Sequence, residues 1–90
     1  MYVWDETKRK SNLEKHGLDF KEAWMADENP DKSTYDTSWP GEHRRMDIAL
    51  AEIHGRVLTL IYTERGEDVR IISFRRASRQ ERDLYEKDQE

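Results

Sequence analysis

Three apolar segments follow one another in the second half of the chain: "MDIALAEI", "VLTLIYT" and "VRIISF". Their β-branched and aromatic residues are typical of strands, and short turn sequences separate them. His54 and Gly55 form a two-residue connection of the kind that makes tight hairpins, and "ERGED" supplies a second turn, in which Gly66 can take a positive φ. The pattern predicts three consecutive antiparallel strands, and this sheet constrains how the rest of the chain folds.

Two helices are predicted ahead of these strands. Asp5 is a good N-cap, and Gly17 stands where a left-handed residue ends a helix. Asp19 begins the second helix with Glu22 at capping-box spacing, and Pro30 closes it. The apolar stripe of this second helix is formed by Phe20, Ala23 and Trp24.

One further helix is predicted at the C-terminus, where Ser78 and Glu81 form a capping box. Residues 32–39 permit a fourth strand at the edge of the sheet, and "PGEHRR" reads as a loop. The predicted fold class is therefore α+β, with two N-terminal helices, a mainly antiparallel sheet of three to four strands and one C-terminal helix. Residues 1–90 are expected to form one domain.

Composition narrows the classes of function. Charged residues make up 40% of the 90 residues and apolar residues 34%. The hydrophobic core is therefore expected to be small, and a partner that covers more apolar surface is expected. Cysteine is absent, which excludes disulfides, thiolate catalysis and Cys-based zinc sites. No segment approaches the roughly 20 apolar residues that cross a bilayer, so a cytoplasmic protein is expected. The net charge is -4, but the arginines concentrate in the second half, which allows one basic face.

Four separated motifs resemble the BrnT family of type II toxins. They are "WD" at 4–5, "N..KHG" at 12–17, "YTERG" at 62–66 and "R.IS.R.A" at 70–77. The resemblance covers most of the chain and matches least well at 27–42. Two departures stand out: His43 and Arg44 precede Arg45, and Phe74 stands where many relatives carry a small residue. Its ring either narrows a groove or fills the core.

The resemblance implies a small ribonuclease with the RelE-like fold, which inhibits translation by cleaving RNA and uses neither a metal nor another cofactor. It also implies a BrnA antitoxin with a ribbon-helix-helix DNA-binding domain as partner. The two form a heterotetramer that represses its own operon, with the antitoxin contacting the DNA. Two alternatives stay open: a homologue that has lost activity and serves as an antitoxin-bound co-repressor, and a nucleic-acid-binding domain without a partner, which the acidic net charge disfavours.

RNA cleavage without a metal needs a base for the ribose 2'-OH, an acid for the leaving 5'-oxygen, and fixed positive charge for the phosphorane between them. The candidate catalytic residues are Lys8, His16, Arg45, Arg65, Ser73 and Arg75. The candidate RNA phosphate ligands are Lys15, Arg70, Arg76 and Tyr85. Three separated histidines give no metal-ligand spacing, so no metal site is predicted.

The last predicted strand carries the densest positive charge. Simple alternation places Arg70, Ile72, Phe74 and Arg76 on one face and Ile71, Ser73 and Arg75 on the other. The small polar Ser73 suggests that its face is the open one, which makes Arg75 the better phosphate candidate. The alternative is that these arginines are solvated ion-pair partners.

Each of the other candidate residues also has a purely structural interpretation. Lys8, Asn12 and Lys15 can share one face of the first helix, yet lysines are common on solvated helices. His16 titrates in the useful range, but a histidine at a helix C-terminus also interacts favourably with the helix dipole. Tyr85 can stack on a base, although its place beside a leucine favours packing against the sheet.

Overall fold

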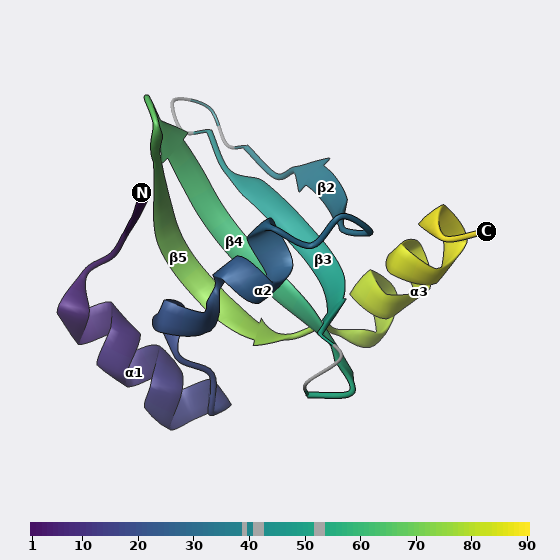
Figure 1. Cartoon of the computed structure of the whole chain (residues 1–90), viewed down its shortest axis with the longest axis horizontal. Helices are drawn as coiled ribbons and strands as arrows, with labels where there is room; N and C mark the ends of the chain where they lie inside the picture. The colour runs from purple at the N-terminus through teal and green to yellow at the C-terminus, as the bar shows by residue number, and fades with distance from the viewer. Residues whose placement is uncertain (39, 41–42, 52–53) are drawn as a thin grey trace.

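A computed structural model describes residues 1–38, 40, 43–51 and 54–90. Figure 1 shows a twisted sheet with a helix in front of it, one beside it and one at its far end. The elements are β1 (Tyr2–Val3), α1 (Glu6–His16), the 3-10 turn η1 (Phe20–Glu22), α2 (Trp24–Asp27), β2 (Ser33–Asp36), β3 (Arg45–Ala51), β4 (Arg56–Arg65), β5 (Asp68–Arg76) and α3 (Arg79–Asp88).

The strands form one sheet in the order β1-β5-β4-β3-β2. β2 to β5 pair antiparallel with their neighbours, and β1 pairs parallel with β5. The α+β class, the meander of β3, β4 and β5 and the edge strand β2 are thus confirmed. β1 is an additional strand of 2 residues, too short to leave an alternating pattern in the sequence.

The two hairpins differ from each other. β4 and β5 are joined through Gly66, whose φ is 59°, and Arg65 pairs with Asp68, as predicted. Ala51 of β3 pairs with Arg56 of β4, and this register differs from the one that a two-residue connection at His54 and Gly55 would give. Residues 52 and 53 of that connection lie outside the described ranges.

The caps of α1 are confirmed. The side chain of Asp5 accepts a hydrogen bond from the backbone N–H of Lys8 at 3.1 Å, and Gly17, at φ 70°, donates its N–H to the carbonyl of Leu13. The capping box of Ser78 and Glu81 is also present, with both reciprocal bonds formed. These local signals fix where α1 begins and ends and where α3 begins.

The second predicted helix is broken into two short pieces. Asp19 caps its start, but the side chain accepts from the N–H of Lys21 and a 3-10 turn follows before α2. Phe20 and Ala23 are buried as predicted, whereas Trp24 is 50% exposed. The predicted apolar stripe is therefore wrong at Trp24, because the change of helix type turns this side chain outward.

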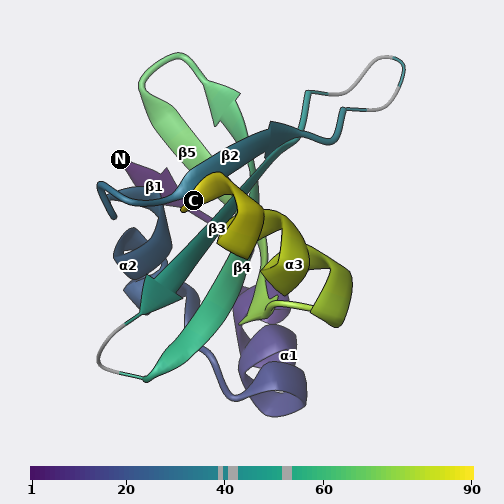
Figure 2. The same ribbon diagram turned by 90° about the vertical axis from the view of Figure 1, so that its right-hand side faces the viewer.

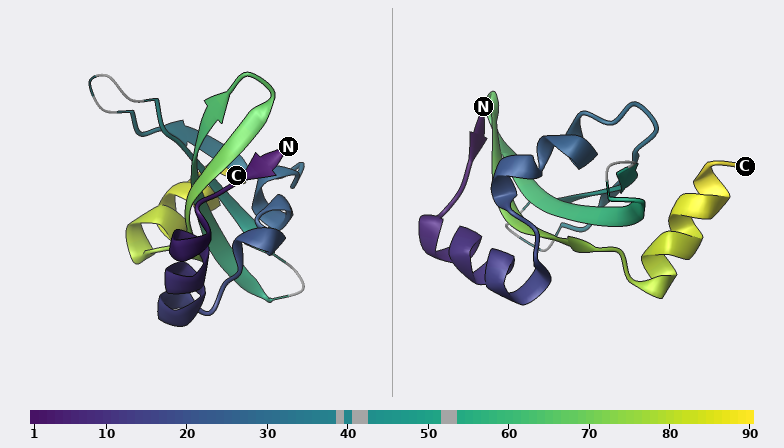
Figure 3. Two further views of the ribbon diagram at one scale, coloured as in Figure 1. Left: turned by 90° about the vertical axis from the view of Figure 1, so that its left-hand side faces the viewer. Right: turned by 60° about the horizontal axis from the view of Figure 1, so that its bottom comes forward.

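The helices lie on different sides of the sheet (Figures 2 and 3). η1 and α2 pack on the face that carries Leu58, Leu60 and Tyr62, which we call the α2 face. Tyr85 of α3 packs with Ile48 on the opposite face, which we call the α3 face. α1 lies alongside β5, the strand next to the short edge strand β1 (Figure 1).

A β-bulge in β5 alters the predicted faces. Ile61 pairs with Ser73 but Tyr62 pairs with Ile71, so Ile72 is the extra residue. Ile71 and Phe74 are consequently both buried in the core of the α2 face, and the prediction that Ile71 shares a face with Ser73 is wrong. The ring of Phe74 is 0% exposed, so it fills the core and does not narrow a groove.

A buried carboxylate lies within the α2 face. Asp47 is 0% exposed and accepts hydrogen bonds from Lys32 Nζ at 3.0 Å, Thr34 Oγ1 at 2.7 Å and the hydroxyl of Tyr62 at 3.0 Å. Burial raises the pKa of Asp47, although the donors around it act in the opposite direction. The network ties β2, β3 and β4 together at one end of the sheet.

Candidate functional site

Two adjoining hollows lie between α1 and the β4–β5 hairpin, with volumes of about 290 and 320 Å³. They share Lys8 and Ile72, and we call them together the basic groove. The first hollow is lined by Lys8, His43, Arg44, Thr63, Glu64, Arg65, Arg70 and Ile72. The second is lined by Thr7, Lys8, Ser11, Asn12, Lys15, His16 and Ile72.

The bulge at Ile72 builds one wall of the groove. Arg70 pairs with Thr63, Ser73 with Ile61 and Arg75 with Thr59. The three β4 partners alternate along one strand, so these three β5 side chains share the α3 face. Simple alternation had separated Arg70 from Ser73 and Arg75, and that part of the prediction is wrong.

A single buried amide holds the other wall in place. Asn12, 8% exposed, donates from Nδ2 to the carbonyls of Leu18 at 3.0 Å and Phe74 at 2.7 Å, and its Oδ1 accepts from the N–H of Phe74 at 3.2 Å. These bonds fasten α1 to β5. The Lys8, Lys15 and His16 side chains are thereby held beside the sheet.

Positive charge dominates the basic groove. Its described lining residues include two lysines, three arginines and two histidines, against the carboxylate of Glu64. Such a cluster matches the phosphates of a nucleic acid, which Arg binds with a planar fork and Lys as a point charge. The chain as a whole carries a net charge of -4, so the groove is a local basic surface on an acidic molecule.

His16 is suited to accept a proton. Burial lowers its pKa, and the positive charges of Lys15 and Arg75 lower it further. The imidazole is therefore mainly neutral at pH 7, the form that acts as a general base.

Arg75 is engaged by a carboxylate from α3. Its guanidinium donates to both oxygens of Glu81, from Nη1 at 2.7 Å and Nη2 at 2.9 Å, and Glu81 also accepts from Thr59 Oγ1 at 3.1 Å and the N–H of Ser78 at 2.8 Å. Burial alone would raise the pKa of Glu81, but the bonds from Arg75 and Ser78 outweigh it and lower the pKa to about 2. Arg75 is an ion-pair partner in this structure.

Three predicted site residues lie elsewhere. Arg45 pairs across the strands with Tyr62, which puts it on the α2 face, where its Nε lies 3.7 Å from a carboxylate oxygen of Glu64. Arg76 pairs with Leu58 on that same face. Tyr85 is 8% exposed and packs with Ile48 under α3. The structure brings together Lys8, Lys15, His16, Arg65 and Arg70, and it places Ser73 and Arg75 on the adjoining surface of the sheet.

Thr63 was not a predicted site residue. It is 9% exposed, lines the first hollow, and its Oγ1 has no hydrogen-bond partner among the described residues. Buried hydroxyls are nearly always hydrogen-bonded in folded proteins, so Thr63 is an exception at the wall of the first hollow. The motif "YTERG" contained it, but a threonine in a strand gives no functional signal by itself.

Residues 4–81 match the model of the family described as "Ribonuclease toxin, BrnT, of type II toxin-antitoxin system". The chain belongs to the BrnT family. It is thus a ribonuclease toxin of a type II toxin-antitoxin system, with the RelE-like fold of that family and a cognate antitoxin as partner. A comparison with curated proteins finds no match. The matched range includes both walls of the basic groove and ends at Glu81.

Proposed function

We propose that this toxin inhibits translation by cleaving RNA in the basic groove without a metal ion. The observation that carries the proposal is the convergence of Lys8, Arg65 and Arg70 from three separate segments on one surface, with the neutral imidazole of His16 beside it. Positive charge and a proton acceptor are the two elements that metal-free phosphodiester cleavage needs.

The proposed reaction starts with a phosphodiester held by Arg65 and Arg70. Neutral His16 takes the proton of the ribose 2'-OH, and the resulting oxygen attacks phosphorus. The bond to the 5'-oxygen breaks, giving a 2',3'-cyclic phosphate and a 5'-OH. Lys8, as a cation, stabilises the charge that develops on the phosphorane and is the candidate donor of the proton that the leaving oxygen takes up.

Thr63 gives this proposal a specific contact. Thr63 lines the first hollow together with Lys8, Arg65 and Arg70. In this proposal its hydroxyl turns toward the bound RNA, and a phosphate or ribose oxygen supplies the hydrogen bond that the described residues do not. We expect Thr63→Val to keep the fold and its stability while lowering RNA cleavage about tenfold, the value of one hydrogen bond to a charged group. Thr37→Val is the matched control, because Thr37 Oγ1 is also buried without a partner among the described residues but does not line the groove.

We further propose that residues 1–90 act as one domain in the cytoplasm, neutralised by a BrnA-like antitoxin. In this proposal the antitoxin carries a ribbon-helix-helix domain, the complex is a heterotetramer, and operator DNA is bound only through the antitoxin. In the described parts of the chain, no helix combines the length and the apolar surface that crossing a bilayer requires.

The rival function is an inactive homologue that acts as an antitoxin-bound co-repressor. The bidentate contact of Arg75 with Glu81 favours it, because an arginine paired in this way is not available to a phosphate. The cationic residues that line the groove do not depend on Arg75, and for this reason we favour the active toxin.

Expression in a bacterium, followed by cleavage assays with purified protein, separates the two functions. We expect the wild type to arrest growth and the antitoxin to relieve the arrest. Arg70→Gln should lower cleavage about 100-fold, as for the loss of one group that stabilises transition-state charge. Arg56→Gln is the matched control, because Arg56 is an exposed strand arginine at the opposite end of β4.

A folded wild-type protein that leaves RNA intact and does not arrest growth, while still binding the antitoxin, would establish the co-repressor function. Equal loss of activity in the Arg70 and Arg56 variants would show that the basic groove has no special role. Cleavage that is abolished by a chelator and restored by a divalent cation would overturn the metal-free reaction.

A further inference from the structure

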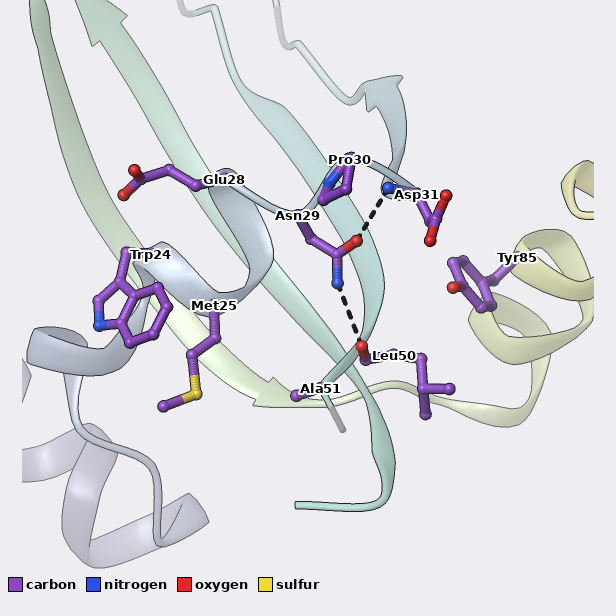
Figure 4. A pocket seen from close by; sticks show the side chains of 9 residues that line it. All are labelled: Trp24, Met25, Glu28, Asn29, Pro30, Asp31, Leu50, Ala51 and Tyr85. Carbon is purple, nitrogen blue, oxygen red and sulfur yellow. Dashed lines mark hydrogen bonds between the residues drawn. The ribbon is translucent and has the colours of Figure 1, made fainter. Parts of the chain in front are cut away.

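A third hollow lies away from the basic groove and differs from it in chemistry. Its volume is about 640 Å³, and it lies between α2, the end of β3 and α3 (Figure 4). Trp24, Met25, Leu50 and Tyr85 give it an apolar lining. It shares no lining residue with the two hollows of the basic groove. We call it the apolar groove.

Two large apolar side chains of this groove are exposed to solvent. Trp24 is 50% exposed and Leu50 41% exposed. An exposed apolar patch with a tryptophan is typical of a surface that binds a partner, because a buried Trp contributes much of the energy at protein interfaces. Phe20 and Ala23, which precede Trp24 in the chain, are almost completely buried. The exposure of Trp24 is thus local to the groove.

The groove is held in shape by bonds between the segments that form it. Asn29 donates from Nδ2 to the carbonyl of Leu50 at 3.1 Å and accepts from the N–H of Asp31 at 2.8 Å. Gln89, which follows α3, donates to the carbonyl of Asp31 at 3.0 Å. Because Asn29 already uses the Leu50 carbonyl at this edge of the sheet, the groove presents side chains to a partner. This favours a helix over an added strand as its occupant.

The negative charge at the rim of the apolar groove indicates the kind of partner that binds there. Glu28 and Asp31 lie at the rim of the groove, as Figure 4 shows. A two-fold dimer through this surface would bring the same carboxylates against each other, since such an interface is self-complementary. Nucleic acid would be repelled for the same reason. A basic partner is favoured.

We propose that the apolar groove binds an amphipathic helix of the cognate antitoxin, with apolar side chains toward Trp24 and Leu50 and basic side chains toward Glu28 and Asp31. The proposal rests on the type II toxin-antitoxin pairing but not on the reaction assigned to the basic groove. The two grooves share no lining residue, so the docked helix leaves Arg65 and Arg70 uncovered. Any block of RNA binding must then come from a different part of the antitoxin.

The test uses the double variant Trp24→Gln/Leu50→Gln and the product of the neighbouring reading frame that encodes the antitoxin. Binding is measured by calorimetry with the purified full-length chains. We expect the double variant to weaken binding at least 100-fold, because two exposed apolar anchors are lost. Leu13→Gln is the matched control, since Leu13 is 39% exposed on α1, and it should bind as the wild type does.

RNA cleavage by the free variants is measured alongside. The double variant should cleave as the wild type does, since neither residue lines the basic groove, whereas Arg70→Gln should lose cleavage and keep antitoxin binding. Wild-type affinity in the double variant, with its fold intact by circular dichroism, would overturn the docking site. Absence of cleavage in every protein, with binding lost only in the double variant, would overturn the proposed reaction and leave the docking site standing.

Discussion

Replacing Glu81 by Gln removes one charge from the Arg75 pair and keeps the shape of the side chain. The pKa of Glu81 is lowered to about 2 from an ordinary value of 4.5, and this difference corresponds to about 3 kcal/mol at roughly 1.4 kcal/mol per pH unit. The pair is partly open to solvent, with 27% of the Arg75 side chain and 13% of the Glu81 side chain exposed. Screening reduces the expected loss of stability to about 2 kcal/mol.

The lowered pKa of Glu81 also predicts how the stability difference between wild type and variant changes with pH. Because the folded state lowers the pKa of Glu81, its contribution is fully present above the ordinary value of 4.5 and is lost as the pH falls toward about 2. Wild type and Glu81→Gln should therefore differ most at neutral pH. The difference in their free energies of unfolding should fall to less than half by about pH 3.

Urea unfolding of both proteins at a series of pH values measures that difference directly. At neutral pH the variant should also melt about 10 °C lower, as expected for 2 kcal/mol in a domain of this size. Glu86→Gln, an exposed change on the same helix, is the control and should follow the wild type. A difference between wild type and Glu81→Gln that stays constant from pH 7 to pH 3 would refute the assignment of the stabilisation to the ionised pair.

Three further changes test other contacts. Asn12→Ala should lower the free energy of unfolding by about 3 kcal/mol, because the buried N–H and C=O of Phe74 lose their partner; thermal melting checks this, with Ser11→Ala as an exposed control. Lys32→Met should cost about 2 kcal/mol by leaving the carboxylate of Asp47 unpaired, and adding Asp47→Asn should restore part of the loss in the same melts. His16→Gln should lower cleavage about 100-fold and remove the acid limb of the pH–rate profile. In the wild type this limb should lie below pH 6.5, because the pKa of His16 is lowered. An unchanged limb in the variant would exclude His16 as the base.

Local signals predicted most of the fold. The cap at Asp5, the glycine at 17 and the box formed by Ser78 and Glu81 act through neighbours in sequence, so each could be recognised without knowledge of tertiary contacts. The β3–β4–β5 meander was equally clear, because its strands are consecutive. The break in the second helix was missed, since Asp19 and Glu22 fit a capping box as well as a 3-10 turn.

The site was only partly predictable, because it depends on tertiary structure. The bulge at Ile72 moves Arg70 to the face of Ser73, and one extra residue in a strand leaves no mark in its composition. Lys8 and Lys15 became groove residues because Asn12 fastens α1 to β5 across 62 positions of the chain. A periodic pattern within α1 can show that these residues share a face, but it cannot show what that face meets.

Asn12 also has a role at the edge of the sheet. β1 pairs with β5 only at Val69 and Arg70, and further along β5 Asn12 takes both backbone groups of Phe74. At the opposite edge Asn29 takes the carbonyl of Leu50, beyond the last pair of β2 with β3. Exposed strand edges invite pairing between molecules, and these two amides occupy backbone groups that a strand of another molecule would need.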